Sequence, residues 1–115
     1  MDKLDWQKII QIRSYCEDIE TFIERFGCDF QTFTEDRAYF NAVSMCILQI
    51  GELANSLSES FRQGTESQIS WRMIRGMRNV LAHSYGEIDE EVIWETVNHD
   101  IPRLKDFCIR LLESQ

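Results

Sequence analysis

Apolar residues recur at three- and four-residue steps along most of this chain, and that periodicity is the strongest constraint on its fold. Between residues 4 and 26 the recurring apolar residues are Ile9, Ile12, Cys16, Ile19, Ile23 and Phe26. This spacing is typical of an amphipathic helix that buries one stripe of side chains. The chain has only five glycines and one proline, which argues against a turn-rich β architecture. We therefore expect an all-α fold.

The same periodicity predicts a second helix over residues 35–62. A short connector at residues 28–33 would precede it, and Thr34 could cap it. Gly51 lies too deep inside this helix to serve as a cap, so we expect it to mark tight packing against a neighbouring helix. Residues 63–68 form the most polar stretch of the chain and are expected to be a surface loop.

Two further helices follow. Ser70 is a suitable N-cap for a helix that begins at Trp71, and Gly86 is a suitable end for it. Asp89 can cap a last helix, in which Pro102 should produce a kink because it lacks an N–H and crowds the preceding turn. We expect one domain over residues 1–115, built as an up-and-down bundle of four main helices with a kinked last helix.

Composition narrows the cellular setting. The four cysteines, Cys16, Cys28, Cys46 and Cys108, are widely spaced and are expected to be buried or half-buried free thiols in a reducing compartment. With only two distant histidines, no metal site is expected. No apolar run is long enough to span a bilayer, and the acidic N-terminus does not resemble a signal peptide. We expect a cytoplasmic protein with no membrane partner.

One segment stands out by charge. Residues 71–86 hold three arginines and no acidic residue, in a chain whose net charge is −8. The segment also holds His83 and Tyr85, and its arginines are Arg72, Arg75 and Arg78. A basic stretch with a titratable imidazole inside an acidic protein is a candidate site. Gly76 costs helix stability there, so it hints at a close approach of another helix.

These residue types suit metal-independent cleavage of RNA. Arginine matches the geometry and charge of phosphate, and histidine can accept or donate a proton near neutral pH. In-line transfer requires an acid and a base on opposite sides of phosphorus, whereas this segment has a single histidine. A two-fold dimer that joins two such helices would supply two histidines to one cleft.

The segment Arg78–Tyr85 resembles the R-x4-H-x-Y motif of the HEPN superfamily. The flanking sequences ISWRMIRGMRN (residues 69–79) and GEID (residues 86–89) resemble the HepT, or DUF86, branch of that superfamily. So does QIGELA at residues 49–54, and the similarity covers nearly the whole chain.

This resemblance implies a HEPN-like helical fold and a dimeric RNase toxin of a type VII toxin–antitoxin pair. By the same resemblance Arg78 and His83 are catalytic and Asn79 supports them at the subunit interface. Tyr85 matches the tyrosine to which a minimal nucleotidyltransferase antitoxin, MntA-like, transfers AMP. An adenylate two residues from His83 would block RNA by bulk and by charge. No cofactor is implied.

Other residues and functions remain open. Glu52 lies on a polar stripe, where it either faces solvent or orients Arg78 or His83 from the adjacent helix. Arg72 and Arg75 are expected to steer RNA, and His99 to be structural. The alternative function is a non-catalytic subunit that binds a nucleotide or presents a substrate to a nucleotidyltransferase. A third is a dimerisation protein whose cleft is vestigial.

Overall fold

The computed structural model describes residues 1–82 and 89–114, and every regular element within them is helical. The four longer helices are α1 (Lys3–Phe26), α3 (Arg37–Ser56), α5 (Trp71–Ala82) and α7 (Ile101–Glu113). The shorter elements are α2 (Phe30–Glu35), α4 (Glu59–Thr65), α6 (Glu90–Glu95) and one π-helical turn, η1 (Thr96–Asp100). The expected all-α class is confirmed.

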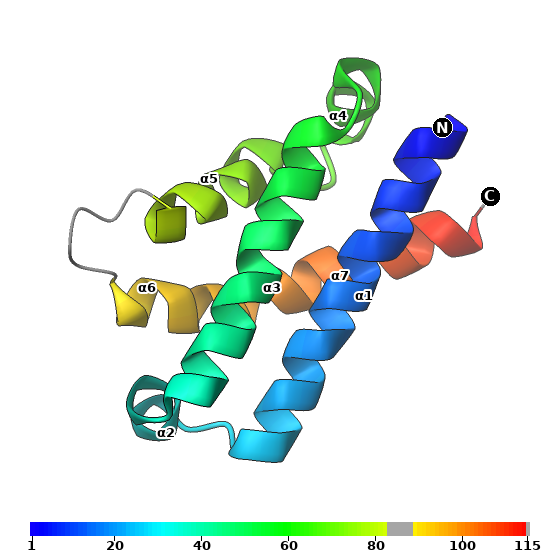
Figure 1. The fold of residues 1–115 in the computed structure, drawn as a ribbon. Coiled ribbons are helices and arrows are strands. Elements are labelled where there is room, and N and C mark those ends of the chain that lie inside the picture. Colours follow the sequence, from blue (N-terminus) through cyan, green and yellow to red (C-terminus); the bar gives the residue numbers. More distant parts are fainter. Residues whose placement is uncertain (83–88, 115) are drawn as a thin grey trace.

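The helices form a bundle around α1 and α3, which lie side by side and run in opposite directions (Figure 1). Helix α5 packs against α3, and α7 packs against α1. The two ends of the chain lie near each other at one end of the bundle, whereas α2 closes the other end (Figure 1). This arrangement leaves one side of α5 exposed beside α3.

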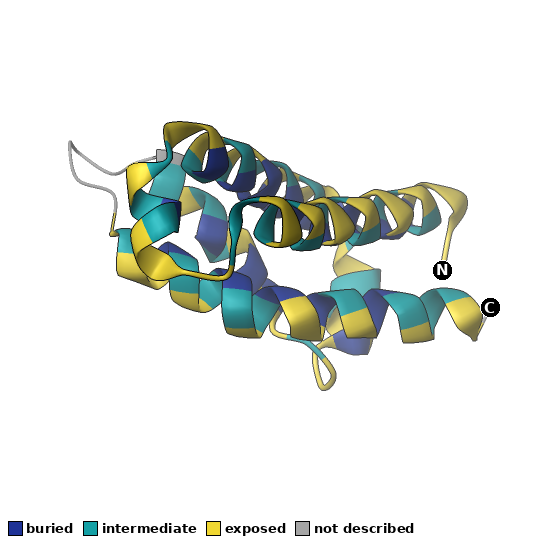
Figure 2. Cartoon of the chain, turned by 90° about the horizontal axis from the view of Figure 1, so that it is seen from below, coloured by how far each residue is buried: buried dark blue, intermediate teal, exposed yellow. Residues whose placement is uncertain are grey.

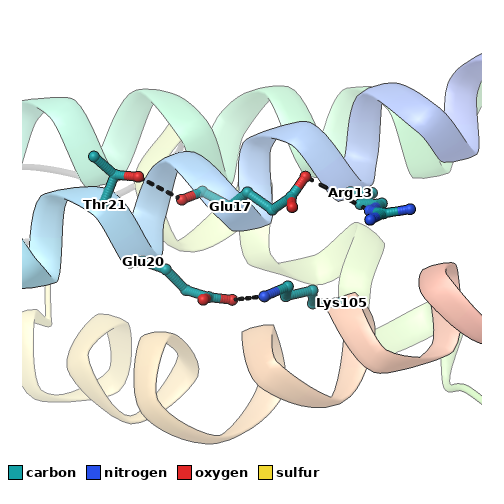
Figure 3. Close-up of polar contacts among 5 residues, drawn as sticks. All are labelled: Arg13, Glu17, Glu20, Thr21 and Lys105. Atoms are coloured by element: carbon teal, nitrogen blue, oxygen red, sulfur yellow. Dashed lines mark hydrogen bonds and ion pairs between the residues drawn. The ribbon is translucent and has the colours of Figure 1, made fainter.

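The predicted apolar stripes face inward, as the buried residues along each helix in Figure 2 show. Each main helix contributes side chains that are at most 1% exposed, among them Ile12, Val43, Ile50, Ile74 and Leu104. An ion pair adds a polar link outside this core, because Nζ of Lys105 on α7 lies 2.7 Å from Oε1 of Glu20 on α1 (Figure 3). Both side chains are partly exposed, so this link contributes little free energy compared with the core.

The expected connector at residues 28–33 is wrong. Residues 30–35 form α2, whose N-cap is Asp29, with the backbone N–H of Thr32 donating to its carboxylate at 2.9 Å. Thr34 does not cap the next helix. That cap is Asp36, whose carboxylate accepts from the N–H groups of Ala38 and Tyr39. Thr34 cannot cap α3 because it lies inside α2, where its hydroxyl donates to the backbone carbonyl of Gln31.

The predicted helix over residues 35–62 is broken at Leu57, whose ψ of 148° is extended. Ser58 then caps α4, with its Oγ accepting from the N–H of Phe61. The buried carboxylate of Asp5 fixes the break, since it accepts from the backbone N–H of Ser58 at 2.9 Å and from its hydroxyl at 2.5 Å. The expected loop at 63–68 is correspondingly shorter, because α4 extends to Thr65.

The last helix opens where proline was expected to disturb it. Asp89 caps α6 as predicted, accepting from the N–H groups of Glu91 and Val92. The chain then passes through η1, in which Ile101 donates its N–H to the carbonyl of Thr96. Pro102 follows in the first turn of α7. The wider π turn thus accommodates a proline that cannot donate the usual helical bond.

All four cysteines are free thiols, as predicted. Cys16, Cys46 and Cys108 are buried as expected, but the expectation is wrong for Cys28, which is exposed between α1 and α2. Across residues 1–82 and 89–114, no helix has both the length and the apolar character that crossing a bilayer requires.

Candidate functional site

The basic helix α5 is fixed at its first residue. Ser70 caps it as predicted, since its Oγ accepts from the N–H of Met73 at 3.3 Å. Trp71 is 3% exposed, and its indole Nε1 donates to Oγ1 of Thr65 at 2.8 Å inside the protein. A buried indole with its one donor satisfied is a rigid anchor. This contact with α4 therefore fixes the start of α5, the helix that carries the arginines.

Helices α3 and α5 approach each other closely at Gly51. A Cβ added to Gly51 would lie 2.8 Å from Cβ of Arg78 and 3.3 Å from its backbone nitrogen. The predicted tight packing at Gly51 is therefore confirmed. The hint of a close approach at Gly76 is wrong, because a Cβ added there would meet nothing within 4 Å.

Two arginines of α5 are held by two side chains of α3. Nε of Arg78 forms an ion pair with Oε1 of Glu52. One helical turn away, Nε of Arg75 donates to Oδ1 of Asn55 at 3.0 Å. Glu52 thus contacts Arg78. Its position on the polar stripe had left open whether it faces solvent or orients Arg78 or His83. The Arg78 and Glu52 side chains are 38% and 54% exposed, so their pairing positions the guanidinium more than it stabilises the fold.

A surface groove of about 440 Å³ runs along this side of α5. Its lining consists of Asn55, Arg72, Arg75, Gly76, Arg78 and Asn79. All three arginines of the basic segment and Asn79 therefore share one hollow, as steps of three along a helix allow. Such a hollow, rich in guanidinium and carboxamide groups, is chemically suited to a phosphate-bearing ligand.

A hollow of about 530 Å³ lies elsewhere, between α2 and the last helices. Asp89, Glu91, Glu95 and Asp100 contribute to its lining. Four carboxylates would repel a polyanion, so this hollow is a poor candidate for RNA despite its size. His99 pairs with Glu95 at 3.2 Å on an exposed part of η1 and α6, in keeping with the structural role expected for it.

His83 and Tyr85 lie outside the described residues, as does Gly86, the predicted end of the basic helix. The described part of α5 ends at Ala82, and His83 is the next residue in the sequence. Within residues 1–82 and 89–114, no three His, Cys, Asp or Glu side chains are grouped to hold a metal ion.

The sequence analysis did not single out Asn55. Its side chain holds Arg75, and its backbone carbonyl accepts from Nη1 of Arg62 on α4 at 3.0 Å. One signal could have found it, because Asn55 stands three residues after Glu52 and therefore on the same face of α3.

Comparison with known proteins finds relatives that match most of the chain. A "Putative RNase" of Caldanaerobacter subterraneus subsp. tengcongensis is 33% identical over 108 residues, which cover 90% of this chain and 96% of that protein. A "Probable ribonuclease HepT" of Thermococcus cleftensis is 35% identical over 99 residues, covering 81% and 88%. A "Putative RNase" of Methanocaldococcus jannaschii is 31% identical over 97 residues, covering 84% and 81%.

No solved structure matches the chain significantly. The family model described as "Ribonuclease HepT-like" does match, and its match spans α1, the arginine groove and nearly all of α7. Since that match covers residues 5–111, the chain belongs to the HepT-like ribonuclease family.

Proposed function

We propose that this protein is a metal-independent endoribonuclease whose catalytic groups are Arg78 and His83. The observation that carries the proposal is the Glu52–Arg78 ion pair at the wall of the arginine groove. It holds a permanent cation one turn before Ala82, the last described residue of α5, and His83 is the next residue in the sequence. Family membership and the names of the relatives support the same activity.

The proposed reaction needs only side chains and the RNA itself. A base removes the proton of a 2′-hydroxyl, and that oxygen attacks the adjacent phosphorus. The bond from phosphorus to the 5′-oxygen breaks while an acid protonates the leaving oxygen. The products are a 2′,3′-cyclic phosphate and a 5′-hydroxyl. Arg78 stabilises the charge that builds on the phosphate oxygens, and Asn79 supports it from the same groove.

The acid and the base come from two chains in this proposal. Each chain has one histidine in the basic segment, so a homodimer with two α5 helices near its axis would supply both. If both histidines serve one cleft, mixed dimers of wild-type and His83→Ala chains are inactive. Equal amounts of the two chains, refolded together, should then show about one quarter of the activity of the same total amount of wild-type chain. Independent sites would leave about one half. The latter result would overturn the shared cleft.

Regulation follows from Tyr85 in this proposal. The protein acts in the cytoplasm as the toxin of a type VII pair, and an MntA-like nucleotidyltransferase silences it by adding AMP to the Tyr85 hydroxyl. An adenylate beside the proposed acid–base residue would exclude RNA by bulk and by repulsion of its phosphates.

The activity is tested with purified protein in excess EDTA. A single-stranded oligoribonucleotide should be cut to products that end in a 2′,3′-cyclic phosphate, and DNA of the same sequence should remain intact because it lacks the 2′-hydroxyl. Equal cleavage of DNA would exclude the proposed nucleophile. Binding of RNA or nucleotide without any cleavage would favour the alternative, a binding subunit that serves a nucleotidyltransferase.

A further inference from the structure

Arg75 is held in nearly the same way as Arg78, although the motif that names Arg78 does not include it. We propose that Arg75, positioned by Asn55, binds the RNA phosphate next to the scissile one, on the side away from His83. This inference rests on the proposed function, and it assigns to Arg75 one defined phosphate instead of a general attraction for RNA.

The geometry is a ladder between two helices. Glu52 and Asn55 lie one turn apart on α3, and their partners Arg78 and Arg75 lie one turn apart on α5. Residues three apart on a helix have Cβ atoms about 5–6 Å apart. From Cβ atoms at that separation, two long arginine side chains can reach two consecutive phosphates of a single strand. The ladder therefore presents two cations in register with two neighbouring phosphates.

Both arginines are fixed through Nε, one of the five N–H donors of a guanidinium. The bond from Arg75 to Asn55 therefore orients the side chain while it takes only a small part of its capacity to donate. The backbone of Asn55 is also bonded, since its main-chain carbonyl accepts from Nη1 of Arg62. A pre-oriented guanidinium loses less conformational entropy on binding phosphate than an unrestrained one does.

The two anchors differ in charge. Glu52 is a carboxylate that balances the charge of Arg78, whereas Asn55 is a neutral amide that orients Arg75 without bringing an opposite charge to it. Electrostatic attraction for a phosphate is therefore greater at Arg75 before RNA binds. Arg75 secures the strand, and Arg78 then meets the phosphate at which charge develops.

The groove provides the room that a nucleotide needs. Gly76 follows Arg75, and a Cβ there would meet nothing within 4 Å, so the groove is open beside the arginine. Arg72 and Arg75 also line a second hollow of about 200 Å³, together with Glu59 and Glu66. These carboxylates disfavour further phosphates, so the favourable track ends after a few nucleotides.

The test uses a substrate in which the position of the scissile phosphate is known. A 2′-O-methyl oligonucleotide with a single ribose can be cut at one linkage only, and a neutral methylphosphonate can replace the phosphate on either side of it. For wild type, a methylphosphonate on the side that Arg75 contacts should lower kcat/KM about tenfold. For Arg75→Gln the same replacement should lower it less than about twofold, since the arginine that bound the phosphate is gone.

Two further variants separate this role from general charge. Asn55→Asp should also reduce the methylphosphonate effect, because its carboxylate would balance Arg75 as Glu52 balances Arg78. Arg37→Gln removes the same charge from the far end of α3 and should keep the full tenfold effect. An unchanged methylphosphonate effect in Arg75→Gln would overturn the proposal, and so would its absence in wild type.

A binding measurement keeps this inference separate from the nuclease assignment. Affinity for a fully 2′-O-methylated oligonucleotide should fall with salt, and Arg75→Gln should reduce the log–log slope by about 0.7, which corresponds to one phosphate contact on a single strand. If wild type cuts no RNA but this slope changes, the proposed function fails and the phosphate site stands. An unchanged slope would overturn the phosphate site even in an active nuclease.

Discussion

Gly51 and Arg78 lie so close together that a Cβ on the glycine would be 2.8 Å from Cβ of the arginine. The contact joins α3 to α5 beside the Glu52–Arg78 ion pair, so one glycine brings together the two helices that build the groove. Because the opposing atom is next to the backbone, it cannot move aside without moving α5.

Gly51→Ala should therefore destabilise the protein by about 1–3 kcal/mol, because overpacking at the contact exceeds the gain in helix propensity. Gly76→Ala is the matched control, with the same chemical change on α5 in open space. It should be neutral or stabilising by up to about 1 kcal/mol. Urea-unfolding midpoints measure both. Equal effects of the two substitutions would contradict the close contact at Gly51.

Glu52 should act as a positioning residue. Glu52→Ala releases Arg78, so kcat for RNA cleavage should fall about tenfold to a hundredfold without a rise in KM, since removing a carboxylate does not weaken RNA binding. Glu52→Gln keeps an oxygen acceptor and should retain more activity than the alanine variant. Glu35→Ala, at the end of α2, controls for the loss of charge. A Glu52→Ala enzyme with unchanged kcat would show that the ion pair has no role in the reaction.

The buried thiols predict a pH dependence of stability. Burial raises the pKa of Cys46 to about 11 and that of Cys108 to about 12, and it also raises the pKa of Cys16. The folded chain therefore holds these protons more tightly than the unfolded chain, whose thiols ionise near pH 8.5. The contribution of the buried thiols to the free energy of unfolding is complete below that pH. It is lost as the pH rises through the pKa values that these thiols have in the folded chain.

Urea titrations should accordingly show the free energy of unfolding falling between about pH 9 and pH 11. Cys46→Ala should flatten that decline. At pH 8 a thiol-alkylating reagent should modify only the exposed Cys28 in the folded protein, and all four cysteines after unfolding. Rapid labelling of a second cysteine in the native state would contradict the burial.

Tyr85→Phe should keep RNase activity and escape inhibition by a cognate nucleotidyltransferase with ATP. A phenol is a poor base at neutral pH, so the loss of its hydroxyl should not slow the reaction. Intact mass should show AMP on wild type and none on the variant. Loss of cleavage would make the hydroxyl catalytic, and AMP on the variant would place the modification on another side chain.

The local signals in the sequence were sufficient for much of the fold. Ser70 and Asp89 cap the helices they were expected to cap, and the helix opens just before Pro102. These features depend on a few neighbouring residues, so a sequence pattern reveals them. Gly51 could also be recognised, because a glycine deep in a helix has few roles other than close packing.

The features that could not be predicted depend on contacts between distant residues. The break at Leu57 requires Asp5, more than fifty positions earlier, to bind Ser58. The Asn55–Arg75 bond depends on how α3 and α5 are rotated about their axes, which periodicity does not specify. Family resemblance gave Arg78 a catalytic role, but it assigned no role to Arg75.

RNA cleavage by matched single variants tests the central claim most directly. His83→Ala and Arg78→Ala should each keep the wild-type helical circular dichroism and unfolding midpoint, while cleavage of an oligoribonucleotide in EDTA falls at least about a hundredfold. Arg37→Gln, which alters charge at the opposite end of α3, should cleave at the wild-type rate. A folded His83→Ala protein that cuts RNA as fast as wild type would contradict the account.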